Sequence, residues 1–230
     1  MREPVPSRFF LLFLVAVAVF GLAVVPLLLL QPNLQGDQLP YRRPLISALY
    51  SAVCVLGVVA VFYPAKCRLM FKKPNTSPDP NTPTHSAVQF RGHHPDCEKF
   101  NANRITIKGR AFCAACSGLL IGAIAAIAGV VLFSLGFFDL GSGNLGVLVA
   151  GEVLMLLGLA QIKMRGYSKM AMNAFFVIGS FMILAVVDLV GQSLLLDLYV
   201  LGLIVFLLWL RILLSEWHNK RTCLACGDCV

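Results

Sequence analysis

The segment RGHHPDCEKFNANRITIKGRAFCAACSGLLIG, residues 91–122, decides how this chain is organised. It gathers two histidines and three cysteines, and it then runs without a break into an apolar stretch long enough for a membrane helix. The sequence on either side is dominated by apolar runs that short polar turns separate. We therefore expect a bundle of membrane helices that holds this Cys/His segment at one face of a lipid bilayer.

The composition supports a membrane protein. Of the 230 residues, 58% are hydrophobic and only 13% are charged, whereas about a quarter of the residues of a soluble domain are charged. The formal net charge is +8, which in a soluble protein would suggest nucleic acid as a partner. Here basic loops lying against anionic lipid explain that charge, so we predict contact with the bilayer and no nucleic-acid partner.

Six apolar runs are long enough to cross the hydrocarbon core of a bilayer. The predicted fold is an all-α integral membrane protein, a bundle of six transmembrane helices over residues 9–30, 45–63, 112–138, 145–162, 171–190 and 194–214. We divide the chain into a first helix pair, a loop with a Pro-rich linker and the Cys/His segment, four further helices, and a Cys-rich tail. These regions cover residues 1–64, 65–111, 112–214 and 215–230.

The distribution of basic residues predicts an orientation. With six spans, alternate connecting segments share a side, and 17 of the 19 Lys and Arg residues then fall on one side. Basic residues near membrane helices mark the cytoplasmic face. We predict a multi-pass protein of the cell (plasma) membrane in which both termini and the Cys/His segment, a small subdomain, are cytoplasmic.

Two local patterns predict structure near the Cys/His segment. Residues 104–108 alternate polar and apolar side chains, which indicates a short strand, and Gly109 supplies a turn after it. Gly118, Gly122 and Ala126 are spaced four residues apart, which lets a neighbouring helix approach closely. That neighbour could belong to a second copy of the chain or to another membrane protein, so we consider a homo-oligomer or a membrane partner at the Gly118/Gly122 face.

Seven of the eight cysteines fall on the predicted cytoplasmic side, where thiols stay reduced. Cysteines gathered in a reducing compartment indicate metal ligands or redox-active thiols. Two cysteines separated by two residues can reach one ion, and the strand and turn could return the chain to complete a tetrahedron. The predicted metal site is a zinc site of three cysteines and one histidine, drawn from His93, His94, Cys97, Cys113 and Cys116.

The tail carries a second cysteine pattern, with Cys223, Cys226 and Cys229 three residues apart. This rhythm matches the opening of a bacterial ferredoxin motif, although the fourth cysteine and its trailing proline are absent. Cys67 or His218 could complete such a site. We therefore predict a second cofactor-binding site, for an iron–sulfur cluster or zinc, or a cap on the first site.

The same thiols allow a different function. Cys113 and Cys116 could form the redox pair of a membrane thiol–disulfide oxidoreductase coupled to a quinone, with Cys97 or the tail cysteines as shuttles. A third alternative, a transporter that uses Glu152 for proton coupling, lacks the broken helices and inverted repeats of such proteins. Phosphate loops, nucleophile elbows and paired catalytic carboxylates are absent from the sequence, which makes a hydrolase or kinase a poor fit.

Two other acidic residues, Asp188 and Asp197, lie near the predicted outer ends of their helices. We expect both carboxylates to be solvated at the interface.

Residues 107–122, IKGRAFCAACSGLLIG, resemble a family of small multi-pass prokaryotic membrane proteins known as a domain of unknown function. That family has a cysteine–histidine segment followed by a Gly and a Cys-Ala-x-Cys-x-Gly motif entering a helix, and Cys97, Gly109, Cys113, Cys116 and Gly118 stand at the matching positions. The chain departs from the family pattern after its first cysteine, where the family has His, and between the paired cysteines, where it has Arg. The resemblance covers about 30 residues, implies the same membrane architecture and implies no activity.

Overall fold

The structure is a computed structural model that describes residues 6–30, 39–62, 98–108, 110–137 and 144–224. Within these ranges six helices are long and apolar enough to cross a membrane, which confirms the predicted six-span bundle. The helices are α1 (Arg8–Leu29), α2 (Arg42–Phe62), α4 (Ala114–Ser134), α5 (Asn144–Leu159), α6 (Gly166–Gly191) and α7 (Leu194–Leu224). Two 3-10 helices, η2 (Glu98–Asn103) and η4 (Ala160–Lys163), and two strands, β1 (Arg104–Ile107) and β2 (Arg110–Cys113), complete the described chain.

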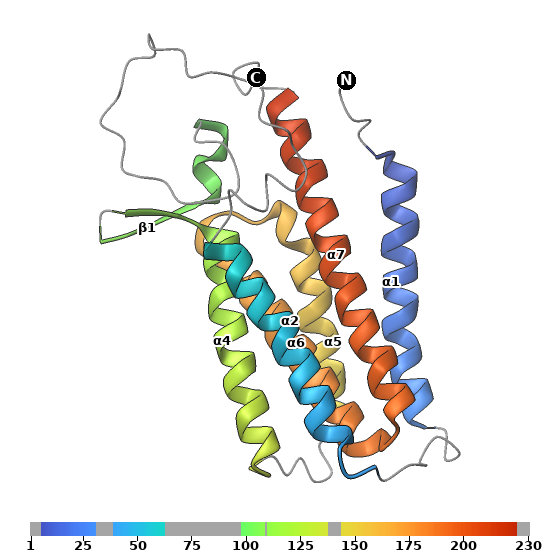
Figure 1. The fold of residues 1–230 in the computed structure, drawn as a ribbon. Coiled ribbons are helices and arrows are strands. Elements are labelled where there is room, and N and C mark those ends of the chain that lie inside the picture. Colours follow the sequence, from blue (N-terminus) through green and yellow to red (C-terminus); the bar gives the residue numbers. More distant parts are fainter. Residues whose placement is uncertain (1–5, 31–38, 63–97, 109, 138–143, 225–230) are drawn as a thin grey trace.

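Helix α6 is the centre of the bundle, and α4 and α5 pack along it (Figure 1). Glycines make this close packing feasible, because a Cβ at Gly118 or Gly122 would meet backbone atoms of α6. Gly151 of α5 and Gly179 of α6 approach each other in the same way. The close helix approach predicted for the Gly118/Gly122 face is confirmed, and the neighbour is α6 of the same chain; association with a second chain stays a prediction.

The remaining helices flank this core. Helix α2 packs along α4 and reaches α6, where the Tyr50 hydroxyl lies 2.8 Å from Ser180 Oγ. Helix α1 packs against α7, and the Tyr199 hydroxyl donates to the carbonyl of Gly21 over 3.0 Å. Large apolar side chains elsewhere on the helices are exposed, Phe9 and Phe20 among them. Such a surface suits lipid contact, and the chain is accordingly a multi-pass membrane protein.

The bundle has two ends, at which different elements meet. At the hairpin end, the antiparallel strands β1 and β2 lead into α4, α6 begins and α7 ends (Figure 1). At the turn end, α2 begins and α6 passes into α7 through Gln192, whose φ of 45° lies in the left-handed region. The start of α1 and the end of α7 both lie at the hairpin end, as an even number of spans requires.

Three element boundaries differ from the prediction. The strand expected over residues 104–108 is one half of a hairpin, and residues 112 and 113, expected in a helix, belong to its second strand. Lys108 adopts a φ of 48°, as the two-residue loops of tight hairpins require. Helix α7 continues ten residues past its predicted end, and α2 begins early enough to include Arg42 and Arg43.

Candidate functional site

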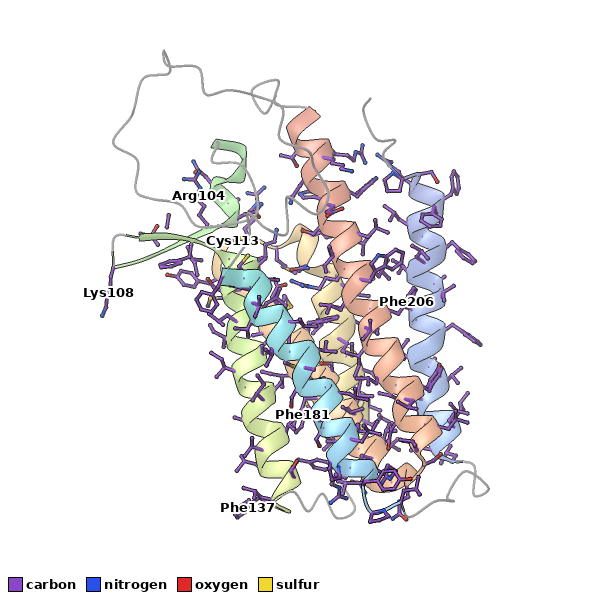
Figure 2. All side chains as sticks on the ribbon, viewed as in Figure 1. Arg104, Lys108, Cys113, Phe137, Phe181 and Phe206 are labelled. Carbon is purple, nitrogen blue, oxygen red and sulfur yellow. The ribbon has the colours of Figure 1, made fainter. Side chains whose placement is uncertain are left out.

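The thiol pair, Cys113 and Cys116, lies where the hairpin meets the membrane bundle. Cys113 is the last residue of β2 and occupies the N-cap position of α4, and Cys116 lies in the first turn of that helix. Figure 2 shows Cys113 at this junction, with Lys108 at the far tip of the hairpin. Cys113 is only 1% exposed and Cys116 is half-buried, and both are free of disulfides. The two thiols therefore lie one turn apart at the N-terminus of a helix.

The hairpin register brings an earlier part of the chain to the thiol pair. Arg104, the first residue of β1, is the antiparallel partner of Cys113, so the strand that follows η2 starts beside this cysteine. Asn103, the last residue of η2, accepts a hydrogen bond from Lys169 of α6 over 2.9 Å. The hairpin is therefore attached to the bundle at its base, beside the thiols.

Two buried cations stand close to the thiol pair. Lys169 of α6 and Arg211 of α7 are 6% and 5% exposed, values that are unusual for free cationic side chains. Both lie near enough to Cys113 to interact with it electrostatically, and Arg211 interacts with Cys116 as well.

Neutral groups satisfy part of the hydrogen-bonding capacity of these cations. Arg211 donates from Nη2 to Gln161 Oε1 over 3.2 Å, and its guanidinium lies 5.5 Å from the centre of the Phe176 ring. Arg211 Nε and the side-chain oxygen of Asn173, a fully buried residue of α6, have no hydrogen-bond partner within the described residues. The site therefore combines positive charge, spare polar atoms and two thiols.

Most of the other predicted site residues lie outside the described part of the chain. His93, His94 and Cys97 lie outside the described residues, as do Cys226 and Cys229, while Cys223 belongs to the last turn of α7. Across the ranges that the structure describes, no three His, Cys, Asp or Glu side chains are grouped closely enough to hold a metal ion. His218 lies on α7 within electrostatic reach of Lys169, which brings a histidine to the hairpin end.

Glu152 lies in α5, as predicted, in the middle of a span. Leu148 lies one helical turn before Glu152, and Met155 lies about one turn after it. Both are fully buried, so the Glu152 carboxyl lies on the most buried face of α5. Its Oε1 atom has no hydrogen-bond partner in the described part of the chain.

The prediction that Asp188 and Asp197 are solvated is wrong, because both are buried in one ion-pair cluster at the turn end. Arg42 Nη1 lies 2.9 Å from Asp188 Oδ1 and 2.5 Å from Asp197 Oδ2. Arg43 Nε lies 2.9 Å from Asp188 Oδ2, and its side chain is 41% exposed. The alternation of spans already puts these four residues at one end of the bundle, and that signal could have predicted the pairing.

Comparison with known proteins adds no further assignment. No protein family model, no curated protein and no solved structure matches the chain. The function must therefore be inferred from the chemistry of the thiol pair and its surroundings.

Proposed function

We propose that this membrane protein carries a metal-binding module at the hairpin end, with a structural or sensing role. The observation that carries the proposal is the presentation of two thiols outside any disulfide, Cys113 and Cys116, in one turn at the junction of a hairpin and a helix. Cys97 and either His93 or His94 would complete a tetrahedral set, for which zinc is the fitting ion. Such a site would stabilise the hairpin. Binding or loss of the metal would also change the bundle, which would let the protein sense the metal supply.

The spacing of the four ligands supports this set. Two residues separate His94 from Cys97, two separate Cys113 from Cys116, and fifteen lie between the two pairs. Paired ligands separated by about 15–20 residues are typical of zinc sites. The hairpin accounts for the return of the chain, because Arg104 pairs with Cys113 and only six residues lie between Arg104 and Cys97.

We also propose that the hairpin end faces the cytoplasm and that the protein resides in the plasma membrane. In support, the only two basic residues assigned to the opposite side are Arg42 and Arg43, and both are paired with carboxylates in the ion-pair cluster. The excess of positive charge is therefore confined to the hairpin end. A reducing cytosol would keep the thiols available for a metal. Alkylation of the cysteines by a membrane-impermeant maleimide only after permeabilisation would agree; labelling of intact cells would refute it.

The tail cysteines, Cys223, Cys226 and Cys229, are proposed as a second site, for zinc or an iron–sulfur cluster. Helix α7 carries the first of them to the hairpin end, the same end as the thiol pair. An iron–sulfur cluster would give a visible absorption band that zinc does not give. Loss of that band in Cys223→Ser with the first site intact would separate the two sites.

The metal content of anaerobically purified protein tests the main proposal. Elemental analysis should give about one zinc per chain for a single tetrahedral site, and Cys113→Ser should lose it. Cys54→Ser is the matched control, because Cys54 is a buried free cysteine of α2, outside the hairpin region. Equal metal content in the two variants, or its absence from the parent protein, would refute the module.

The partial exposure of Cys116 beside the buried Cys113 favours a second function, a thiol–disulfide oxidoreductase. Exchange requires one accessible sulfur, and Cys116 provides it. Oxidation of both thiols to a disulfide would release two electrons and two protons, which a membrane quinone would take up to become a quinol. Metal-free protein whose thiols cycle with an added quinone, and lose this activity in Cys116→Ser, would establish the alternative.

A further inference from the structure

The two thiols of the hairpin end differ in their access to solvent, although they lie within one turn of each other. Cys113 is 1% exposed and Cys116 is half-buried. Ala114 and Ala115, which lie between them, are buried as well. The first turn of a membrane helix lies near the bilayer surface, where side chains normally contact water or lipid headgroups. The burial of Cys113 therefore means that other parts of the chain pack over the start of α4.

The base of the hairpin packs against α6 beside this buried thiol. Both β1 and η2, the 3-10 helix before it, contact α6. Ile105 of β1 and Ala111 of β2 are buried, whereas Lys108 at the hairpin tip is exposed. Figure 2 shows Cys113 next to the bundle and Lys108 far from it. The hairpin is thus held at its base and open to solvent at its tip.

A hydrogen bond ties this base to α6. Lys169 Nζ donates to Asn103 Oδ1 over 2.9 Å. Asn103 immediately precedes Arg104, and Arg104 is the strand partner of Cys113, so the bond lies one residue away from this strand pair. Lys169 is buried, and a hydrogen bond from a charged donor shielded from water is stronger than one between neutral groups in solvent. The bond is therefore well placed to fix the hairpin base.

We propose that the Asn103–Lys169 hydrogen bond is a clasp that controls access to Cys113. With the clasp closed, as in the structure, the hairpin base packs on α6 and withholds Cys113 from solutes, while Cys116 stays accessible. With the clasp open, the hairpin base moves away from α6 without detaching, because β2 continues directly into α4. Such control goes beyond the proposed function, because access to the thiol requires neither a bound metal nor a quinone.

A clasp of this kind gives the thiol pair an order of reaction. A solute that reacts with thiols meets Cys116 first, and it reaches Cys113 only while the hairpin base is open. Local opening then governs the reaction rate of the buried thiol, as it governs the exchange of buried amide hydrogens. Weakening the clasp should raise the rate at Cys113 and leave the rate at Cys116 unchanged.

Alkylation kinetics test the clasp. Full-length protein in detergent, reduced and treated with a chelator, is mixed with N-ethylmaleimide, and mass spectrometry of peptide fragments gives the rate at each cysteine. In the parent protein, Cys116 should react faster than Cys113. In Asn103→Ala the rate at Cys113 should rise about tenfold, the effect of losing one charge-assisted hydrogen bond on an opening equilibrium. Asn101→Ala, which changes an exposed asparagine of the same 3-10 helix, is the matched control and should behave like the parent.

Two further readouts separate the clasp from a general effect on stability. Asn103→Asp keeps an oxygen that can accept the hydrogen bond from Lys169, so Cys113 should react as slowly as in the parent or more slowly. Cys54 of α2 is buried outside the hairpin region, so its alkylation reports on loosening of the whole bundle. We change Asn103 rather than Lys169 because loss of a nearby positive charge alters the reactivity of a thiol by itself.

Three results would overturn the clasp. One is an equal rate at Cys113 in Asn103→Ala and Asn101→Ala. Another is a parent protein in which Cys113 reacts as fast as Cys116. The third is a rise at Cys54 that accompanies the rise at Cys113, because the bond would then stabilise the bundle as a whole. None of these results depends on metal content, so the metal module can fail in elemental analysis while the clasp holds, and the reverse.

Discussion

Both ends of the bundle bury arginine, but they differ in what offsets its charge. At the turn end, Arg42 contacts two carboxylates that are buried with it, Asp188 and Asp197. At the hairpin end, Arg211 is equally buried and contacts an amide, and among the described residues the groups able to bear negative charge that interact with it are the thiols of Cys113 and Cys116. Two carboxylates offset the charge of a buried arginine without any ligand, whereas a thiol offsets it only when the thiol is deprotonated or bound to a metal.

Burial of charge alone therefore does not identify a functional site. The ion-pair cluster of the turn end is balanced by groups that the fold itself supplies, so it needs no ligand. Among the described residues of the hairpin end, the groups that interact with Lys169 and Arg211 and can bear negative charge are Cys113 and Cys116. Changes at the turn end should therefore affect stability and leave metal binding alone, and changes near the thiol pair should affect both.

The largest expected effect comes from removing one carboxylate of the turn end. Asp197→Ala leaves Arg42 with Asp188 as its remaining ion partner, and breaking a buried pair costs about 3–5 kcal/mol of unfolding free energy. We expect the lower part of that range because Asp188 still lies 2.9 Å from Arg42. Denaturant unfolding in detergent micelles measures the cost, and metal content should equal that of the parent.

Glu216→Ala is the control for this change, because Glu216 is an exposed acidic residue of the same helix. Exposed substitutions usually change the unfolding free energy by no more than about 0.5 kcal/mol. If Asp197→Ala were as stable as Glu216→Ala, the ion-pair cluster would not stabilise the turn end. If Asp197→Ala lost metal, the two ends would not be independent of each other.

A smaller effect is expected where helix packing sets the position of the thiol pair. A Cβ at Gly118 would overlap the carbonyl oxygen of Met170 and lie 2.7 Å from the Cβ of Asn173, so Gly118→Ala must push α4 away from α6. Overpacking of this kind costs about 1–3 kcal/mol. Since Gly118 follows Cys116 by two residues, the shift should also weaken metal binding, which Co²⁺ titration detects.

Gly57→Ala is the matched change in α2, because a Cβ there meets no atom within 4 Å. Alanine is a better helix former than glycine by about 1 kcal/mol, so this variant should be as stable as the parent or slightly more stable. A Gly118→Ala protein that behaved like Gly57→Ala in both stability and Co²⁺ affinity would show that the α4–α6 contact does not position the thiols.

Much of the fold could be predicted from the sequence, because a long uncharged run has few alternatives to a membrane helix. The second strand could not, because residues 111–113 are apolar and merge with the run that follows them. The thiol pair was predicted, but its cations were missed. Arg211 lies close to the predicted end of its span, where a charged side chain is expected at the membrane interface. Because α7 is longer than predicted, Arg211 lies inside the bundle instead. Which charges meet at the hairpin end is a property of packing, which a single sequence does not display.

The smallest expected effect lies midway between the two ends, at Tyr50 of α2. Its hydroxyl donates to the carbonyl of Val177 over 3.1 Å and lies 2.8 Å from Ser180 Oγ. Ser180 Oγ also donates to that carbonyl, so Tyr50→Phe leaves both α6 groups with a partner and should cost about 0.6 kcal/mol, the average for side-chain hydrogen bonds inside a membrane protein. A double-mutant cycle with Ser180→Ala measures the coupling. Because Tyr50 carries no charge and lies away from both ends, the metal content and Co²⁺ affinity of the variant should match those of the parent. A loss of either would mean that α2 transmits strain to the thiol pair. The properties of the hairpin end would then depend on the packing of α2.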